Sequence, residues 1–157
     1  MNWRGSTTVS DRIFAALPYL LPLIYGIGFG AFIFRDFPVL ELLLVPLSPF
    51  LALYRIPFAS IIIFFLLFFL VVRNSNISHF IRFNTMQAIL LDIVLFLCQL
   101  LFGLLSNSLG EGLLVQTLSN VIFLGMLAAV VYSVAQSLMG RYAEIPTISE
   151  AVHMQVR

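Results

Sequence analysis

The stretch Arg82-Phe-Asn-Thr-Met-Gln-Ala-Ile-Leu-Leu-Asp-Ile93, which runs on to Ser106, places one carboxylate inside sequence that is otherwise apolar enough for a membrane. At about 100° per residue on a helix, its polar and small residues fall on one side and its aliphatic residues cover the rest. These residues are Asn84, Ala88, Asp92, Gln99, Gly103 and Ser106. A charge near the bilayer centre costs about 2.5–3.5 kcal/mol, so Asp92 should face protein or water. The stripe therefore predicts a neighbouring helix, a cavity, or both.

The composition is that of an integral membrane protein. Of the 157 residues, 61% are hydrophobic and only 10% are charged, whereas soluble domains carry roughly a quarter charged residues. All basic residues are Arg and they form no run, which leaves no electrostatic basis for binding nucleic acid. The single cysteine, Cys98, excludes an intrachain disulfide and a cysteine-based metal site. We expect it to be a small buried hydrophobe.

Hydropathy predicts an all-α protein with a bundle of four transmembrane helices. A polar N-terminal lead at residues 1–12 comes first, and a surface tail at residues 141–157, with His153 exposed, comes last. The predicted spans are residues 13–34, 56–72, 85–105 and 116–138. The second span is at the lower limit of length for crossing a hydrocarbon core of about 30 Å.

The segment between the first two spans, residues 39–54, is apolar but interrupted by Glu41, Pro46 and Pro49. It is too short and too rich in proline for a straight membrane-spanning helix. We therefore expect an interfacial or re-entrant segment here.

Small residues mark the expected helix contacts. Gly26 and Gly30 have the small-xxx-small spacing that lets helices approach closely, although a hinge or a backbone facing a ligand would also use these glycines. On the fourth span, Gly125, Ala129, Ser133, Gln136 and Gly140 form a second stripe that can face the first. The predicted packing positions are Gly26, Gly30, Gly103, Gly125 and Ala129. The predicted polar seam is Asn84, Asp92, Gln99, Ser133 and Gln136.

Four spans place both termini on one side of the membrane. The side with the termini carries six arginines, and the other side carries only Arg35 and Arg55. The six are Arg4, Arg12, Arg73, Arg82, Arg141 and Arg157. Because loops rich in Arg and Lys stay cytoplasmic, the termini should face the cytoplasm, or the stroma in a plastid.

The sequence contains none of the motifs of common enzyme or cofactor sites. No phosphate-binding glycine loop, HExxH, CxxC or GxSxG occurs. His79 has no second ligand at metal-binding spacing, so we expect no metal, no cofactor and no catalysis. A small proton-coupled transporter would use a lone acid such as Asp92, but four short spans make a very small transporter.

Several segments resemble the Tic-twenty family, the small membrane subunit of the protein translocon in the chloroplast inner envelope, and its cyanobacterial homologues. They are Asp11-Arg-Ile-Phe-Ala-Ala-Leu-Pro-Tyr-Leu-Leu-Pro-Leu23, Tyr54-Arg-Ile-Pro-Phe-Ala-Ser60, Val72-Arg-Asn74, the stretch from Arg82 to Asp92, and Ala143-Glu-Ile-Pro-Thr-Ile-Ser-Glu-Ala-Val-His-Met-Gln-Val156. The resemblance implies a four-span protein that takes part in preprotein passage with partner subunits. No amino-terminal targeting segment is evident, so the chain looks more like a cyanobacterial or otherwise untargeted member.

Two hypotheses for the polar seam remain open. In the first, the seam lines or adjoins a path for extended polypeptide in a translocon, and Asp92→Leu impairs translocation or assembly. In the second, the seam is dry and only holds helices together, and the protein is a scaffold or assembly factor of another membrane complex. Both hypotheses require other membrane subunits as partners, within the lipid bilayer.

Overall fold

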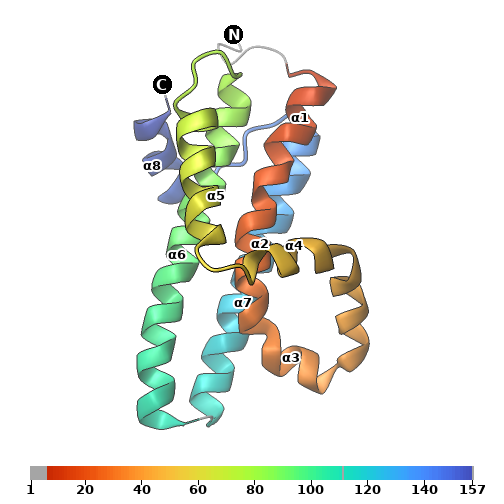
Figure 1. Ribbon diagram of the computed structural model, residues 1–157, viewed down its shortest axis with the longest axis vertical. Coiled ribbons are helices and arrows are strands. Elements are labelled where there is room, and N and C mark those ends of the chain that lie inside the picture. The colour runs from red at the N-terminus through yellow and green to blue at the C-terminus, as the bar shows by residue number, and fades with distance from the viewer. Residues whose placement is uncertain (1–6, 111, 157) are drawn as a thin grey trace.

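The computed structural model describes residues 7–110 and 112–156. The predictions for residues 1–6, including Arg4, and for Glu111 and Arg157 lie outside them. All regular structure within the described residues is helical. Three helices are long and apolar enough to cross a membrane, and a bent pair of helices supplies a fourth span if it is counted as one. Both termini lie at the same end of the bundle (Figure 1). The predicted α-helical membrane fold is confirmed.

The first span is one apolar rod, Val9–Asp36. Thr8 starts it with a capping box, in which its hydroxyl accepts from the Asp11 N–H and Asp11 accepts from the Thr8 N–H. Pro18 lies in the first of two short 3₁₀ turns, where its missing N–H costs the helix least. The segments of the rod are α1 (Val9–Ala16), η1 (Leu17–Tyr19), α2 (Leu20–Gly26), η2 (Ile27–Gly30) and α3 (Ala31–Asp36).

The next apolar stretch is a bent pair of helices. Its two parts, Pro38–Tyr54 and Ala59–Val72, meet at an angle of 95°. At the break, Pro57 precedes Phe58, which has a positive φ of 64°. The segments are η3 (Pro38–Leu47), α4 (Ser48–Tyr54), α5 (Ala59–Leu67) and η4 (Phe68–Val72). The irregular segment that the prolines predict is therefore present, and the following helix begins at Ala59 rather than at residue 56.

The last two spans form an antiparallel hairpin, α6 (His79–Leu109) and α7 (Leu113–Leu138). Ser78 caps α6 by accepting a hydrogen bond from the Ile81 N–H at 3.3 Å. This cap starts the helix at His79, well before the expected residue 85. Residues 80–82 accordingly belong to the helix instead of the polar connection.

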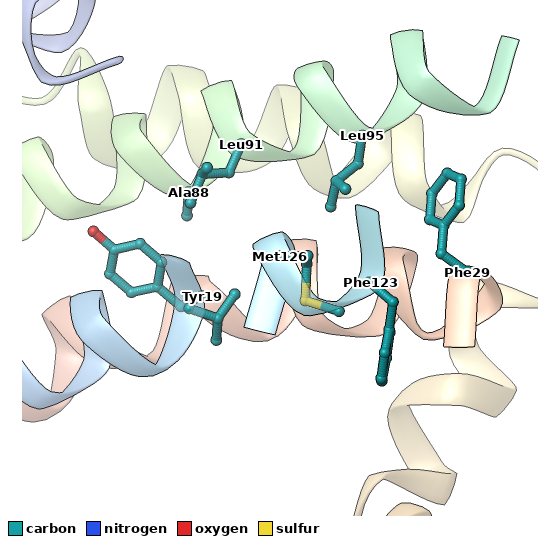
Figure 2. Close-up of a cluster of buried hydrophobic side chains, with 8 residues drawn as sticks. Tyr19, Phe29, Ala88, Leu91, Leu95, Phe123 and Met126 are labelled. Atoms are coloured by element: carbon teal, nitrogen blue, oxygen red, sulfur yellow. The ribbon is translucent and has the colours of Figure 1, made fainter. Parts of the chain in front are cut away.

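The core lies where the first rod crosses α6 and α7 (Figure 2). Buried residues recur on α7 with alternating spacings of four and three, which gives one continuous buried face. They are Ser119, Phe123, Met126, Val130, Ser133 and Ser137. A Cβ atom added at Gly26 would lie 2.6 Å from Met126, and one at Gly30 would lie 2.8 Å from Phe123. These two glycines therefore allow the close contact that their spacing predicts.

The C-terminal tail differs from the expected surface segment. It ends in helix α8 (Ile148–Gln155), which packs on α6. Ala143, Val152 and Val156 are buried, and the last two join Phe83 of α6 in a second apolar cluster. His153 is only partly exposed and contacts the Phe83 ring. Apolar residues at this spacing give the short helix one face that packs against α6.

Candidate functional site

A buried group of hydrogen-bonded side chains, which we call the polar cluster, joins the first rod, α6, α7 and the tail. Its members are Tyr19, Asn84, Gln87, Ser137 and Ser149, all buried. The Tyr19 hydroxyl donates to Asn84 Oδ1 at 2.7 Å, and the Ser137 hydroxyl lies 3.0 Å from the same oxygen. Asn84 Nδ2 donates to the Phe80 carbonyl at 2.9 Å. Both polar atoms of the Asn84 side chain are therefore paired.

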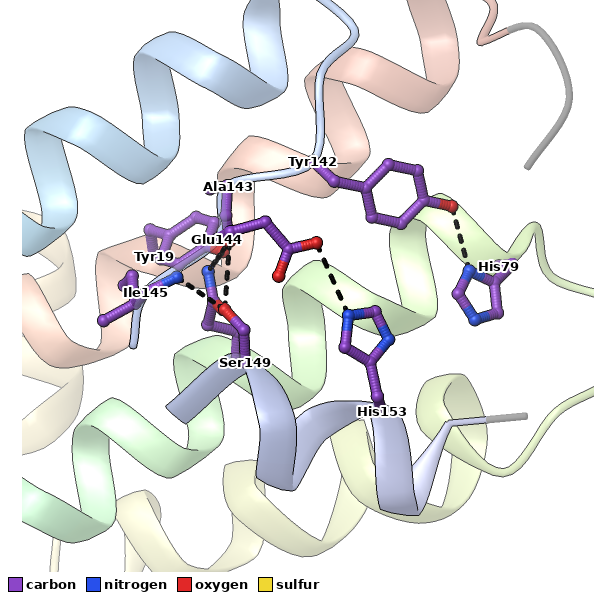
Figure 3. A network of polar contacts seen from close by, with 9 residues as sticks. Tyr19, His79, Tyr142, Ala143, Glu144, Ile145, Ser149 and His153 are labelled. Carbon is purple, nitrogen blue, oxygen red and sulfur yellow. Dashed lines mark hydrogen bonds and ion pairs between the residues drawn. The ribbon is translucent and has the colours of Figure 1, made fainter. Parts of the chain in front are cut away.

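Gln87 connects the polar cluster to the tail. Its Nε2 donates to the Tyr19 hydroxyl and to the Ala143 carbonyl, each at 2.9 Å. The Ser149 hydroxyl lies 2.8 Å from Gln87 Oε1 and accepts from the Ile145 N–H. Figure 3 shows this arrangement where the tail crosses α6. The tail is thus fixed by buried hydrogen bonds as well as by apolar contact.

Two further polar pairs hold the tail at its edge. The ring Nδ1 of His79 lies 2.9 Å from the Tyr142 hydroxyl. His153 Nε2 lies 3.4 Å from Glu144 Oε1 (Figure 3). Each histidine thus contacts a polar residue of the tail. Among the residues that the structure describes, no group of three His, Cys, Asp or Glu side chains could hold a metal ion.

Asp92 lies apart from the polar cluster. It is partly buried on α6 and lines a cavity of about 440 Å³, here called the Asp92 cavity. The walls include Tyr25, Ser60, Phe64, Phe65 and Phe96. Its Oδ1 atom is buried and has no hydrogen-bond partner in the described chain. The cavity therefore contains an acceptor that the protein itself leaves unpaired.

The Asp92 cavity shows where along α6 the break between α4 and α5 lies. Asp92 is about 20 Å from the first residue of α6 and about 25 Å from the last, at 1.5 Å per residue. Ser60, the second residue of α5, lines the same cavity. The half-helix α5 therefore begins beside the middle of α6, and Figure 1 shows the connection from α4 at this height.

A larger cavity, here called the apolar cavity, lies between the first rod, the broken span and the start of α6. It measures about 680 Å³, and its lining is almost entirely apolar. Tyr54 and Thr85 are its polar lining residues, and both hydroxyl oxygens are buried without a hydrogen-bond partner in the described residues. Buried hydroxyls are normally paired, so this cavity has unused capacity for hydrogen bonding.

The predicted polar seam divides into separate places. Asn84 and Ser133 are buried beside the polar cluster, whereas Asp92 lines its own cavity. Gln99 is exposed on the second half of α6, and Gln136 is only partly buried on α7. The five residues therefore do not form one continuous seam. On α7, the face that packs is rotated from the predicted stripe and shares only Ser133 with it. On α6, the buried residues end at Leu95, before Gln99.

The other predicted packing positions also differ. A Cβ atom added at Gly103 or Gly125 would meet nothing within 4 Å, so neither glycine makes a close helix contact inside this chain. Ala129 is partly buried and lines a small cavity together with Cys98. The cysteine is accordingly only partly buried.

Sequence reasoning missed Tyr19, Gln87, Ser137 and Ser149. Gln87 lies outside the chosen stripe, Tyr19 is a lone polar residue among apolar neighbours, and Ser137 directly follows Gln136 but lies on a face of the helix that was not chosen. A polar side chain within a membrane span is by itself a signal, because it needs a partner there. No such signal was available for Ser149, since its tail seemed too polar to be buried.

Taken together, the fold and these sites define a small polytopic α-helical membrane protein with a bent pair of helices after its first span. A family profile described as "Chloroplast import apparatus Tic20-like" matches residues 9–152. A Tic20 family protein of Synechocystis sp. (strain ATCC 27184 / PCC 6803 / Kazusa) is 52% identical over 149 residues, which cover 94% of this chain and 93% of the relative. The chloroplastic protein TIC 20-v of Arabidopsis thaliana is 38% identical over 153 residues, 96% of this chain and 73% of the relative.

The chain belongs to the Tic20 family. This result confirms the resemblance seen in the sequence. The matched region extends from the start of α1 to residue 152, within α8, so it includes most of the docked tail as well as the spans.

Proposed function

We propose that this protein is a non-catalytic membrane subunit of a protein translocon, and that it takes part in polypeptide passage across the plastid inner envelope or its cyanobacterial counterpart. Membership of a family described by its role in chloroplast import supports a translocon-related role. The more specific proposal is that the protein contacts the polypeptide as it crosses the membrane. The geometry of the break between α4 and α5 supports this contact.

The break at residues 55–58 is the observation that carries the proposal. Non-helical backbone at membrane depth is tolerated only where protein covers it or where it lines a cavity. Here Ile56 and Phe58 are 56% and 74% exposed, and the exposed Arg55 is next to them. The N–H groups of Arg55, Ile56 and Ala59 are paired within the turn, so the group that needs cover at this depth is the exposed Arg55 side chain, and a partner subunit or a passing polypeptide would supply it.

The apolar cavity beside the break is suited to an extended polypeptide. Its apolar walls would accept side chains, and the hydroxyls of Tyr54 and Thr85 would pair with backbone groups that have no partner in an extended chain. The polar cluster is not the path, because its hydrogen bonds close the space between the helices. We therefore place the passage beside α5 and not through the bundle.

We further propose that both termini face the cytoplasm or the stroma. The connection at residues 73–78 lies at the same end of the bundle as the termini (Figure 1). Because the break is at mid-depth, Arg55 no longer counts as a loop residue on the other side. Arg35 alone remains there, which strengthens the charge asymmetry of the loops.

The sealed polar cluster favours a second candidate, a scaffold or assembly factor. In this role the hydrogen bonds fix the bundle, and exposed polar residues such as Gln99 mark contacts with other subunits. A scaffold would bind partner subunits without contacting the translocated chain.

Site-specific photocrosslinking to an arrested polypeptide distinguishes the two candidates. A photoreactive residue would replace Leu53, which lines the apolar cavity, or Val131, which is 64% exposed on α7. Passage beside α5 predicts adducts with the arrested chain at position 53 and none at 131. Adducts with membrane subunits alone, at both positions, would contradict the translocon proposal and support the scaffold.

A further inference from the structure

We infer that the Asp92 cavity receives the charged group of an Arg or Lys side chain from a membrane helix of a partner subunit. The inference rests on the proposed function to the extent that it requires a partner subunit. It goes further by naming the residue that binds the partner and the chemistry of the partner's group.

The Asp92 carboxylate has an oxygen atom, Oδ1, that is buried and unpaired among the described residues. The ion pairs seen in the described residues, Arg35–Asp36 and His153–Glu144, both lie away from the cavity and do not involve Asp92. An acid at this depth is stabilised by a partner of opposite charge, and none is supplied from within the described residues.

The direction in which the cavity opens follows from its exposed wall residues. Ile61 and Phe65 of α5 are 53% and 50% exposed, and Phe96 of α6 is 49% exposed, although all three line the cavity. The opening is therefore on the outer surface of the bundle, between α5 and α6. An occupant reaches it sideways, from within the bilayer.

The depth of Asp92 limits what can pair with it. Asp92 is seven residues, about 10 Å, inside the predicted span of residues 85–105, so a lipid headgroup outside the hydrocarbon core does not pair directly with its carboxylate. A basic side chain carried by a transmembrane helix can be placed at this level. Lipid chains could fill the volume but would leave the carboxylate unpaired.

The walls of the cavity have a chemistry that suits a cation. Tyr25, Phe64, Phe65 and Phe96 surround the acid with aromatic rings, and the face of an aromatic ring attracts a cation. Ser60 adds a hydroxyl that can accept a hydrogen bond from a guanidinium or ammonium group. A volume of about 440 Å³ accommodates a long side chain. These features together favour a cation over a neutral polar group.

A peptide-association assay tests the inference with the full chain in liposomes. The probes are fluorescent transmembrane peptides of Leu and Ala that carry one central Arg, Gln or Leu. We expect the Arg peptide to associate about tenfold more tightly with the wild-type protein than with Asp92→Asn, as measured by energy transfer. The Gln and Leu peptides should not distinguish these two proteins, and moving the Arg to the end of the peptide should remove its advantage.

Three variants control for folding and for general charge. Asp36→Asn removes an exposed carboxylate and should leave association unchanged. Asp92→Glu retains the charge and should retain most of the association. Ser60→Phe fills the cavity while the acid remains, so it should weaken association. This variant tests the inference independently if Asp92→Asn proves too unstable to measure.

Equal association of the Arg and Gln peptides with the wild-type protein would overturn the inference. So would a loss of association in Asp36→Asn as large as that in Asp92→Asn. Either result would leave the proposed function intact as long as the arrested polypeptide still forms adducts at position 53. Conversely, the absence of those adducts would count against the proposed function whatever the peptides do.

Discussion

The Tyr19 hydroxyl donates a 2.7 Å hydrogen bond to Asn84 Oδ1, across the contact between the first span and α6. The same hydroxyl accepts from Gln87 at 2.9 Å. One phenol therefore connects two residues of α6 that are almost one helical turn apart, and through Gln87 it is connected to the tail. This arrangement fixes the rotation of α6 relative to the first rod.

Tyr19→Phe should lower the stability of the protein without unfolding it. Both Asn84 and Gln87 keep another partner in the variant, so the cost is that of lost hydrogen bonds and not of an unpaired buried group. We expect about 0.6–1.5 kcal/mol, seen as an apparent Tm lower by roughly 2–4 °C in mild detergent. Tyr132→Phe, at an exposed position of α7, is the matched control. Equal effects of the two substitutions would contradict a structural role for the cluster.

Gly30→Ala should destabilise the contact between the first rod and α7. The added Cβ would lie 2.8 Å from carbon atoms of both Phe123 and Phe34, and these rings cannot move aside freely. We expect a loss of about 1–3 kcal/mol in thermal or denaturant unfolding. Gly28→Ala, two residues away and open to space, should instead be neutral or stabilise the helix by up to about 1 kcal/mol. A stabilising Gly30→Ala would show that the helices do not pack this closely.

Ser149→Ala should loosen the docked tail selectively. It removes the hydroxyl that lies 2.8 Å from Gln87 Oε1 and that accepts from the Ile145 N–H, so both groups lose a buried partner. Because each unpaired group costs about 1–3 kcal/mol, hydrogen exchange in α8 should be at least about tenfold faster. Exchange in α7 should not change. Glu150→Gln, at the exposed neighbouring position, should leave α8 protected.

Thr85→Val should stabilise the isolated protein. The Thr85 hydroxyl is buried in the apolar cavity without a partner among the described residues, and Val replaces it with a methyl group of similar shape. Removing such an orphan hydroxyl should gain about 1 kcal/mol in unfolding experiments on the purified chain. The same substitution should weaken crosslinking of an arrested polypeptide at position 53. A destabilised Thr85→Val would mean that the hydroxyl has a partner within the folded chain.

Hydropathy predicted most of the fold because crossing a membrane constrains length and polarity strongly. The apolar runs around residues 13–34 and 85–105 were found, and the prolines at 46 and 49 correctly indicated an irregular segment between the first two spans. Hydropathy could not give the angle of 95° between the two halves, since that angle depends on contacts in three dimensions and not on local polarity.

The candidate site was less predictable from the sequence. A helical wheel identifies which residues share a face, but not which face packs. At about 100° per residue, the buried face of α7 is turned by roughly 80° from the predicted stripe, which leaves Gly125 exposed and Gln136 only partly buried. Asp92 was found because a charge in an apolar run stands out. Ser149 was missed since its burial depends on the fold of the tail over α6, a tertiary effect that local polarity does not reveal.

The depth of Phe58 in a lipid bilayer is the most direct test of the broken span. In a Cys98→Ala background, spin labels at Phe58→Cys, Phe96→Cys and Phe37→Cys would be compared by their relative accessibility to oxygen and to a water-soluble nickel complex; all three side chains are exposed. The account predicts that the label at position 58 lies as deep as the label at position 96, in the middle of α6. A label at 58 as shallow as the one at position 37 would place α4 at the membrane surface and contradict the account.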